Sequence, residues 1–284
     1  MEARKGGAAR QVLIDAAGFA RAKDFDRAAD ACLAAAAKIE AKAPSSRLLK
    51  ARLLTDAAEY LNLLKSRAGE AALAAREAIR LLGRLPAAET LMIRACQASG
   101  QAAWSIGGPV AALSPYRRAR RLLERFPGKK GDLAQALDNE ALCLHALGRV
   151  EEALSLQRRG LKIATRLGLA ERRRSLMRRM SNALQDLDQE DQAEELLEAA
   201  RPPSRASVRE RVGWFHSRAL LAERRGRYSQ AEDWFDRATD LLEKHPDKVP
   251  DMVACLVNAA LLKIELGSEA QARRLLAAAD VIAP

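Results

Sequence analysis

Seven alanines recur along the chain at nearly one interval. They are Ala28, Ala71, Ala112, Ala153, Ala193, Ala231 and Ala272. The spacing between neighbours in this series stays between 38 and 43 residues. A fixed period of about 40 residues indicates one supersecondary unit copied along the chain, because such units bury their apolar faces only against their neighbours. The sequence therefore predicts a stacked-repeat architecture, which is typical of binding proteins.

Two kinds of break alternate between these alanines. Short turns precede the alanines at Lys23-Asp24, residues 66–69, residues 107–109, Gly148, Asp188, Gly226 and Gly267. The breaks between units carry Pro44, Pro86, Pro127, Pro202-Pro203, and Pro246 with Pro250, while Gly168 marks the fourth boundary. Gly and Asp suit helix ends and Pro cannot continue a helix, so each unit is predicted to be two antiparallel helices, A and B. The units begin near residues 9, 52, 93, 134, 174, 212 and 253.

The composition agrees with an all-α chain that forms a single solenoid domain over residues 1–284. Hydrophobic residues make up 49% of the chain, mostly Ala and Leu, and aromatic residues only 4%. Ala and Leu favour helix. No apolar run approaches about 18 residues and no apolar signal segment follows Met1, so no membrane span is expected. The dispersed cysteines favour a reducing cytoplasm over a disulfide framework; they are Cys32, Cys96, Cys143 and Cys255.

Three segments around the alanines resemble the tetratricopeptide repeat. They are residues 139–153, residues 219–231 followed by Phe235 and Ala238, and residues 258–272. Each has small residues in helix A, Gly at the turn and Ala in helix B. The period near 40 residues is similar to the long-repeat branch, which includes kinesin light chain and regulatory domains of bacterial signalling proteins. The resemblance implies a right-handed α-solenoid whose helices A line a concave groove that binds a protein or peptide.

The resemblance also implies contact residues on helix A. Asn139 and Asn258 stand two residues before the small residue of their helix, where an Asn of long-repeat proteins bonds the backbone of a ligand. Arg178 and Asn182 echo a carboxylate-clamp pattern. Ser217 stands where the second Asn of such a clamp would be, so capture of a terminal carboxylate is not expected.

A polar stripe is predicted on the helix A that begins near residue 174. Arg174 and Arg178 are four residues apart and therefore share a helix face. With Asn182 and Gln185 they form the best candidate for a ligand contact on the groove. The alternative is that these residues pair with acids of the neighbouring unit.

The net charge of +11 is concentrated in the middle of the chain. Residues 116–130, 158–179 and 201–227 together carry +20, mostly from arginine, and the rest of the chain carries −9. A solvated helix surface is the simplest interpretation. The alternatives are an acidic protein partner, which suits the guanidinium fork, and a nucleic acid, for which interleaved stacking aromatics are lacking. Arg117, Arg118, Arg120 and Arg121 fall on a helix B, so most of them are expected to face outward.

Enzyme chemistry finds little support, and we expect no catalysis, cofactor or metal. His145, His216 and His245 lie in different units. Cys143 and His145 are two residues apart and so point in different directions on a helix. The sequence has no zinc-ligand spacing and no phosphate-binding glycine loop. Three tryptophans are expected to pack in the core rather than form a binding cage; they are Trp104, Trp214 and Trp234.

The sequence thus favours a non-catalytic scaffold or adaptor that binds a protein or peptide in its helix-A groove. A second interpretation is the sensory or regulatory arm of a multidomain signalling protein, with a caspase-like peptidase or a transcription regulator as its effector. The last helix, residues 269–282, is apolar for a capping helix, with Leu275, Leu276, Val281 and Ile282 before Pro284. We therefore expect either more chain after residue 284 or an edge that meets a partner or another copy.

Overall fold

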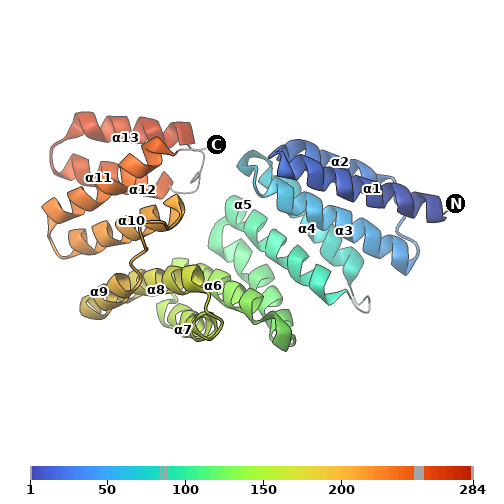
Figure 1. Ribbon diagram of the computed structural model, residues 1–284, viewed down its shortest axis with the longest axis horizontal. Coiled ribbons are helices and arrows are strands. Elements are labelled where there is room, and N and C mark those ends of the chain that lie inside the picture. Colours follow the sequence, from blue (N-terminus) through green and yellow to red (C-terminus); the bar gives the residue numbers. More distant parts are fainter. Residues whose placement is uncertain (1, 84, 86–87, 246–252, 283–284) are drawn as a thin grey trace. The chain divides into compact units, whose positions relative to one another are not determined.

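The computed structural model describes residues 2–83, 85, 88–245 and 253–282. The described residues form thirteen α-helices and two short 3-10 helices, with no strand among them (Figure 1). This confirms the predicted all-α helical-repeat fold. The chain divides into two compact units, each larger than the two-helix repeats predicted above. They comprise residues 1–156 and 157–284, and from here on we call them unit one and unit two. That the two units continue each other as one uninterrupted solenoid stays a prediction.

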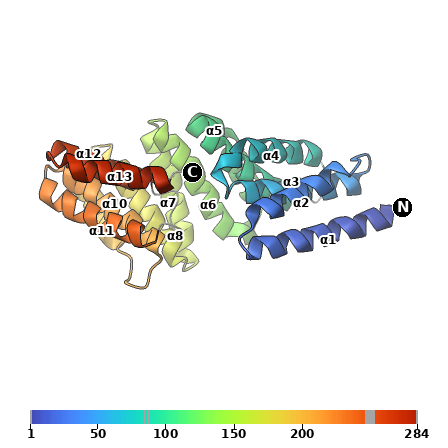
Figure 2. The ribbon, with the colours of Figure 1, turned by 90° about the horizontal axis from the view of Figure 1, so that it is seen from above.

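Unit one is built from helices that pack against their neighbours in chain order. They are α1 (Glu2–Arg21), α2 (Phe25–Ala37), α3 (Pro44–Leu61), α4 (Ala68–Leu82), α5 (Glu89–Leu123), α6 (Lys130–Ala146) and the first part of α7 (Val150–Arg166). Helices α1 to α4 lie side by side in both views (Figures 1 and 2). Helix α3 also contacts α1 and α5, so the first helices of successive pairs stack on each other.

Unit two repeats the same arrangement. After the end of α7 its helices are α8 (Ala170–Gln185), α9 (Glu190–Ala199), α10 (Val208–Arg224), α11 (Tyr228–Lys244), α12 (Val253–Glu265) and α13 (Glu269–Ile282). The pairs α8–α9, α10–α11 and α12–α13 form hairpins, and α10 packs against α8 and α9 of the preceding hairpin. Pro86, Pro246, Pro250 and Pro284 of the sequence analysis lie outside the described residues, as do the side chains of Val281 and Ile282.

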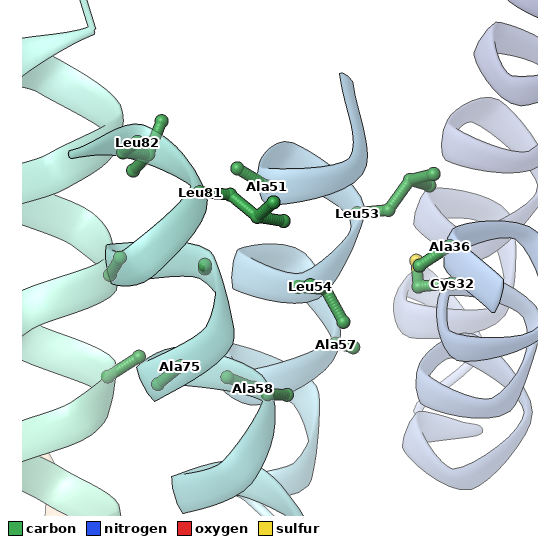
Figure 3. Close-up of a cluster of buried hydrophobic side chains, with 14 of the residues drawn as sticks. Cys32, Ala36, Ala51, Leu53, Leu54, Ala57, Ala58, Ala75, Leu81 and Leu82 are labelled. Carbon is green, nitrogen blue, oxygen red and sulfur yellow. The ribbon is translucent and has the colours of Figure 1, made fainter. Parts of the chain in front are cut away.

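The seven recurring alanines lie in the second helix of each pair and are buried. Six of them have no exposed surface and Ala272 is 2% exposed. A methyl group at this position lets the first helix of the pair approach closely, and the buried layers are accordingly thin. Figure 3 shows one such layer, in which Cys32 and Ala36 of α2, Leu53 of α3 and Ala75 of α4 fill the space between three helices. Burial of this kind drives the stacking of the hairpins.

The same type of backbone hydrogen bond closes most helices at their C-terminal ends. The N–H of a residue just after the helix donates to the carbonyl oxygen of the residue five positions earlier, as from Arg149 to Leu144 and from Arg227 to Ala222. The residue just before this donor is left-handed, with φ of 74° at Gly148 and 55° at Asp188. This is the Schellman motif, which glycine favours because it has no Cβ to clash. The same bond recurs at Asp24, Leu169, Gln189 and Ser268.

Two turns of unit one differ from the simple glycine turn. The break expected at residues 66–69 lies earlier than predicted, because α3 ends at Leu61 and Gly69 is already inside α4. The break expected at residues 107–109 is present, as a sharp kink that divides α5 into two arms, although α5 carries a single label; Gly108 there has φ of 63° and ψ of −158°. The two arms of α5 then pack so closely that a Cβ on Gly100 would lie 2.6 Å from the ring of Tyr116. Only glycine fits at that position.

Ion pairs of partly or almost fully buried cations join successive hairpins. In unit one, Arg94 of α5 pairs with Asp56 of α3 at 2.6 Å and also with Glu59. In unit two, the ammonium of Lys263 on α12 lies 2.7 Å from Glu232 and 3.0 Å from Asp236 of α11, and the lysine side chain is only 6% exposed. These pairs fix the position of one hairpin on the next.

No helix in the described part of the chain is long and apolar enough to cross a membrane.

Candidate functional site

The predicted polar stripe on α8 exists and faces α10. Arg174 donates from Nε to Glu210 of α10, and both side chains are largely buried. One turn further along, the guanidinium of Arg178 lies against Gly213, where an added Cβ would come within 3.1 Å of it. Gly213 thus leaves the space that the arginine occupies. The two contacts set a register in which residues of α8 meet residues of α10 about 35 positions later.

A histidine carries the polar contacts from α10 to α12. The Nδ2 of Asn258 lies 3.0 Å from Nε2 of His216. An amide nitrogen only donates, so Nε2 accepts and the imidazole is neutral. Burial, together with the smaller effect of the charge of Arg178, lowers the pKa of His216 from 6.5 to about 4. We call Arg174, Arg178, Asn182, Gln185, Glu210, His216, Ser217 and Asn258 the polar line; it crosses the first helices of three successive hairpins.

Three members of the polar line each have a buried side-chain atom without a hydrogen bond. The Oδ1 of Asn182, the Nε2 of Gln185 and the Oγ of Ser217 are buried and make no hydrogen bond to any described residue. In the register set by Arg174 and Arg178, Asn182 stands opposite Ser217. Buried polar atoms are usually paired, so unpaired ones concentrated at one place mark a site that a water or a ligand completes.

The last predicted contact, Asn139, lies in unit one. It belongs to α6, and its Oδ1 accepts a hydrogen bond of 2.7 Å from Nε2 of Gln135. The structure therefore brings Arg174, Arg178, Asn182, Gln185 and Asn258 together in unit two, whereas Asn139 belongs to unit one. Whether these residues contact a partner stays a prediction.

Sequence reasoning missed the residues of α10 that face the stripe. Glu210, Gly213 and His216 each contact a predicted residue of α8 or α12. The available signal was the repeat period itself, because residues about 36 positions apart fall on the same face of successive first helices. His216 was weighed only as a catalytic or metal-binding group, so its place on this face was not noticed.

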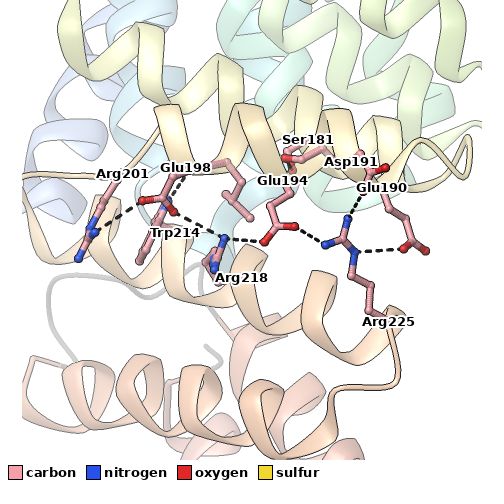
Figure 4. A network of polar contacts seen from close by, with 11 residues as sticks. Ser181, Glu190, Asp191, Glu194, Glu198, Arg201, Trp214, Arg218 and Arg225 are labelled. Atoms are coloured by element: carbon pink, nitrogen blue, oxygen red, sulfur yellow. Dashed lines mark hydrogen bonds and ion pairs between the residues drawn. The ribbon is translucent and has the colours of Figure 1, made fainter.

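Much of the arginine band is paired with acids of neighbouring helices. Figure 4 shows Arg225 reaching Glu190, Asp191 and Glu194 of α9. In the same view Arg218 lies between α10 and α9, with Glu194 at 3.6 Å. These pairs agree with the simplest interpretation of the charge band, a helix surface whose arginines are partly balanced by nearby acids. They neutralise part of the positive charge of unit two.

The arginines of the second arm of α5 divide into two groups. Arg118 and Arg121 are exposed, as expected for a helix B. Arg117 and Arg120 instead turn toward α6, where both pair with Glu140 at 2.9 and 2.6 Å. The carboxylate of Glu140 is 3% exposed, so it needs both guanidinium groups as counter-charges. The expectation that these arginines mostly face outward was wrong for Arg117 and Arg120.

The tryptophans pack as expected for structural residues. Trp214 is 4% exposed and donates from Nε1 to the carbonyl of Leu197 at 2.7 Å. Its ring meets Trp234 edge-on, with centroids 5.5 Å apart, and Arg218 lies over both rings. Trp104 is partly buried against the core of unit one. No group of three or more His, Cys, Asp or Glu side chains that could hold a metal occurs among the described residues.

The fold is that of tetratricopeptide-like helical-repeat proteins. No protein-family model matches the sequence, and no curated protein matches it. Solved structures match at low identity. Apo RapI is 10% identical and is covered over 97% of each chain, with a TM-score of 0.68. A Rap protein complexed with competence and sporulation factor is 16% identical over 95% of this chain and 74% of that chain, with a TM-score of 0.65.

Two further matches carry the repeat in their names. A tetratricopeptide repeat protein from Parabacteroides merdae is 18% identical over 97% of this chain and 93% of that chain, with a TM-score of 0.64. The nearly identical tetratricopeptide-like repeats of a putative kinesin light chain are 16% identical over 68% of this chain and 94% of that chain, with a TM-score of 0.56. The predicted resemblance to long tetratricopeptide repeats is confirmed at the level of the fold.

The neutral state of His216 predicts a pH-dependent stability. Its pKa is about 4 in the folded chain and about 6.5 when unfolded, so the unfolded state binds more protons between these values. Stability should therefore fall as the pH drops from 6.5 to 4, by about 3 kcal/mol at most. Urea unfolding of the wild type and of His216→Gln at pH 7.5 and 4.5 measures this. The variant should lose less stability on acidification; an equal loss would show that His216 does not titrate as described.

Proposed function

We propose that this chain is a non-catalytic scaffold that binds an extended peptide segment of a protein partner along the polar line of unit two. The observation that carries the proposal is the set of buried polar atoms without partners on Asn182, Gln185 and Ser217. A peptide backbone offers alternating N–H donors and C=O acceptors. It can therefore supply an N–H to Oδ1 of Asn182 and a carbonyl to Nε2 of Gln185.

The flanking residues of the polar line support the same proposal. Arg178 and Asn258 lie on either side of His216, and the neutral imidazole adds no charge that would repel a backbone. Arg174 is held by Glu210 and contributes by fixing α8 against α10. A similar fold, that of a Rap protein, is known in complex with competence and sporulation factor. Asn139 is proposed as a separate contact in unit one.

We further propose that the partner segment is acidic. The chain carries a net charge of +11, and several arginines near the polar line are exposed, among them Arg173 on α8. Positive potential around a site raises the rate at which an acidic segment reaches it, and the effect weakens with salt. The repeat architecture suits this mode of binding, because stacked first helices present one long surface to an extended chain.

A peptide-array experiment tests the proposal. The full chain is applied to arrays of acidic, neutral and basic peptides at about 0.15 M salt, where surface charges are partly screened. The wild type should retain a sequence-selective subset of the acidic peptides. Arg178→Glu/Asn182→Ala should lose that subset by about tenfold or more, because it reverses a charge and removes hydrogen bonds.

A matched control separates the polar line from general charge. Arg273→Glu makes the same charge reversal at an exposed position of α13, a helix that contributes no residue to the polar line, and should leave the selected subset unchanged. Equal retention by the wild type and by Arg178→Glu/Asn182→Ala would remove the polar line as the site. Binding of RNA or DNA that exceeds peptide binding and falls steeply with salt would contradict a peptide partner.

A further inference from the structure

A small cavity lies in unit one, and no residue of the polar line belongs to that unit. Its volume is ≈ 220 Å³, below the roughly 300 Å³ at which pockets for drug-sized ligands begin. It opens to solvent and is lined by α4 and by both arms of α5, which the kink at Gly108 folds against each other. The polar residues that line it are Arg76, Ser99, Ser114 and Arg118, with Cys96 and Ala111 between them.

The lining residues occupy single faces of their helices. Cys96 and Ser99 are three apart on the first arm of α5, and Ser114 and Arg118 are four apart on the second arm. Arg76 comes from the middle of α4. Residues from three helix faces thus line the same small cavity.

The two arginines of the cavity differ from their neighbours in being unpaired. Arg80, one turn along α4 from Arg76, forms an ion pair with Glu77, and Arg117 and Arg120 share Glu140. Arg76 and Arg118 form no ion pair or hydrogen bond with any described residue. No Asp or Glu lines the cavity. The site therefore holds two positive charges and no negative one.

The remaining polar groups of the cavity can donate to an anion. Ser99 is 7% exposed and makes no hydrogen bond within the described part of the chain, so its hydroxyl is free to donate. Ser114 adds a second hydroxyl. Burial raises the pKa of the Cys96 thiol to about 11, partly offset by the charge of Arg118, so the thiol stays protonated at neutral pH. It adds no charge that would repel an anion.

We propose that this cavity binds a small tetrahedral oxyanion, namely inorganic phosphate or the phosphoryl group of a small phosphate monoester. Two guanidinium forks and two hydroxyls match the several acceptor oxygens of a phosphoryl dianion, and charge-assisted hydrogen bonds to arginine are the strong ones. The volume accommodates the phosphoryl group and little else. This inference does not depend on the proposed peptide site, which lies in unit two.

Calorimetric titration of the full chain tests the proposal. The probes are inorganic phosphate and phosphoserine, at pH 7.5 and low chloride, with sodium acetate at matched ionic strength as the reference anion. Phosphate should bind saturably, and acetate should bind more weakly by about tenfold or more. Comparable binding of phosphoserine would assign the site to monoesters, and binding of phosphate alone would assign it to the free ion.

Variants locate the binding in the cavity. Arg76→Gln/Arg118→Gln should weaken phosphate binding by at least about tenfold, because it removes both charges. Ala111→Leu keeps both charges but places a larger side chain at the exposed rim of the cavity, and it should weaken binding to a similar degree. Arg52→Gln, on an exposed position of α3 that does not line the cavity, should bind like the wild type. Circular dichroism verifies that each variant is folded.

Three outcomes would overturn the proposal. The first is the absence of saturable phosphate binding to the wild type. The second is unchanged affinity in Arg76→Gln/Arg118→Gln. The third is a loss of affinity in that double variant with full affinity in folded Ala111→Leu, which would place the anion on the arginine surface outside the cavity.

Discussion

Replacing Glu140 with alanine is expected to lower the free energy of unfolding by about 3 kcal/mol. The carboxylate of Glu140 is 3% exposed and pairs with both Arg117 and Arg120. Arg120 is itself only 13% exposed, so the variant leaves a mostly buried guanidinium with Glu124 as its remaining acidic partner. Urea unfolding of the full chain, followed by circular dichroism, measures the change.

The pair of Arg149 and Glu152 provides the control. Both side chains are largely exposed, at 42% and 58%. Glu152→Ala should therefore change the free energy of unfolding by about 1 kcal/mol or less. If Glu140→Ala costs no more than Glu152→Ala, the buried ion pair between α5 and α6 does not contribute as described.

Phe235→Ala is expected to destabilise unit two by about 3–5 kcal/mol. Phe235 has no exposed surface and packs in the core cluster that α10, α11, α12 and α13 share. Its removal withdraws a large apolar side chain and leaves a cavity that the thin, alanine-rich layers cannot fill. Amide hydrogen exchange, read by mass spectrometry, should show faster exchange in residues 208–244.

Tyr228 serves as the matched aromatic control on the same helix. It begins α11 and is 47% exposed. Tyr228→Ala should therefore change stability by about 0.5 kcal/mol. Unchanged exchange in the Phe235 variant, with a stability like that of the Tyr228 variant, would contradict the assignment of Phe235 to the core.

The helical hairpins could be predicted from the sequence because the period repeats. Ala153 and Ala231 stand at the same position of their two-helix repeats, and both are fully buried. Turn residues were predictable for the same reason, since Gly148 and Gly226 adopt the left-handed conformation that ends a helix before a tight turn. The position of the break at Gly108 was predictable in the same way, but its conformation was not, because a glycine followed by proline permits both an open turn and a sharp reversal.

For the candidate site, the sequence predicted the residues that α8 contributes but not the residues of α10 that they contact. Arg174 and Arg178 were found from their spacing on a single helix, but their neighbours on α10 depend on how two helices stack. Local spacing says which residues share a face, and only the stacking register says what that face meets. For the same reason the sequence could not separate Arg120, which turns to Glu140, from Arg118, which lines a cavity.

The cations between hairpins have a consequence for how the chain avoids misfolding. The ion pairs recur with the repeat, because Lys263 meets Glu232 and, one repeat earlier, Arg225 meets Glu194. The small alanine side chains alone would let one hairpin slide along the next. Such a slide would separate Lys263 from Glu232 and Asp236 and leave its ammonium desolvated without a counter-charge, which is strongly unfavourable. The ion pairs thus keep stacked hairpins from slipping out of register.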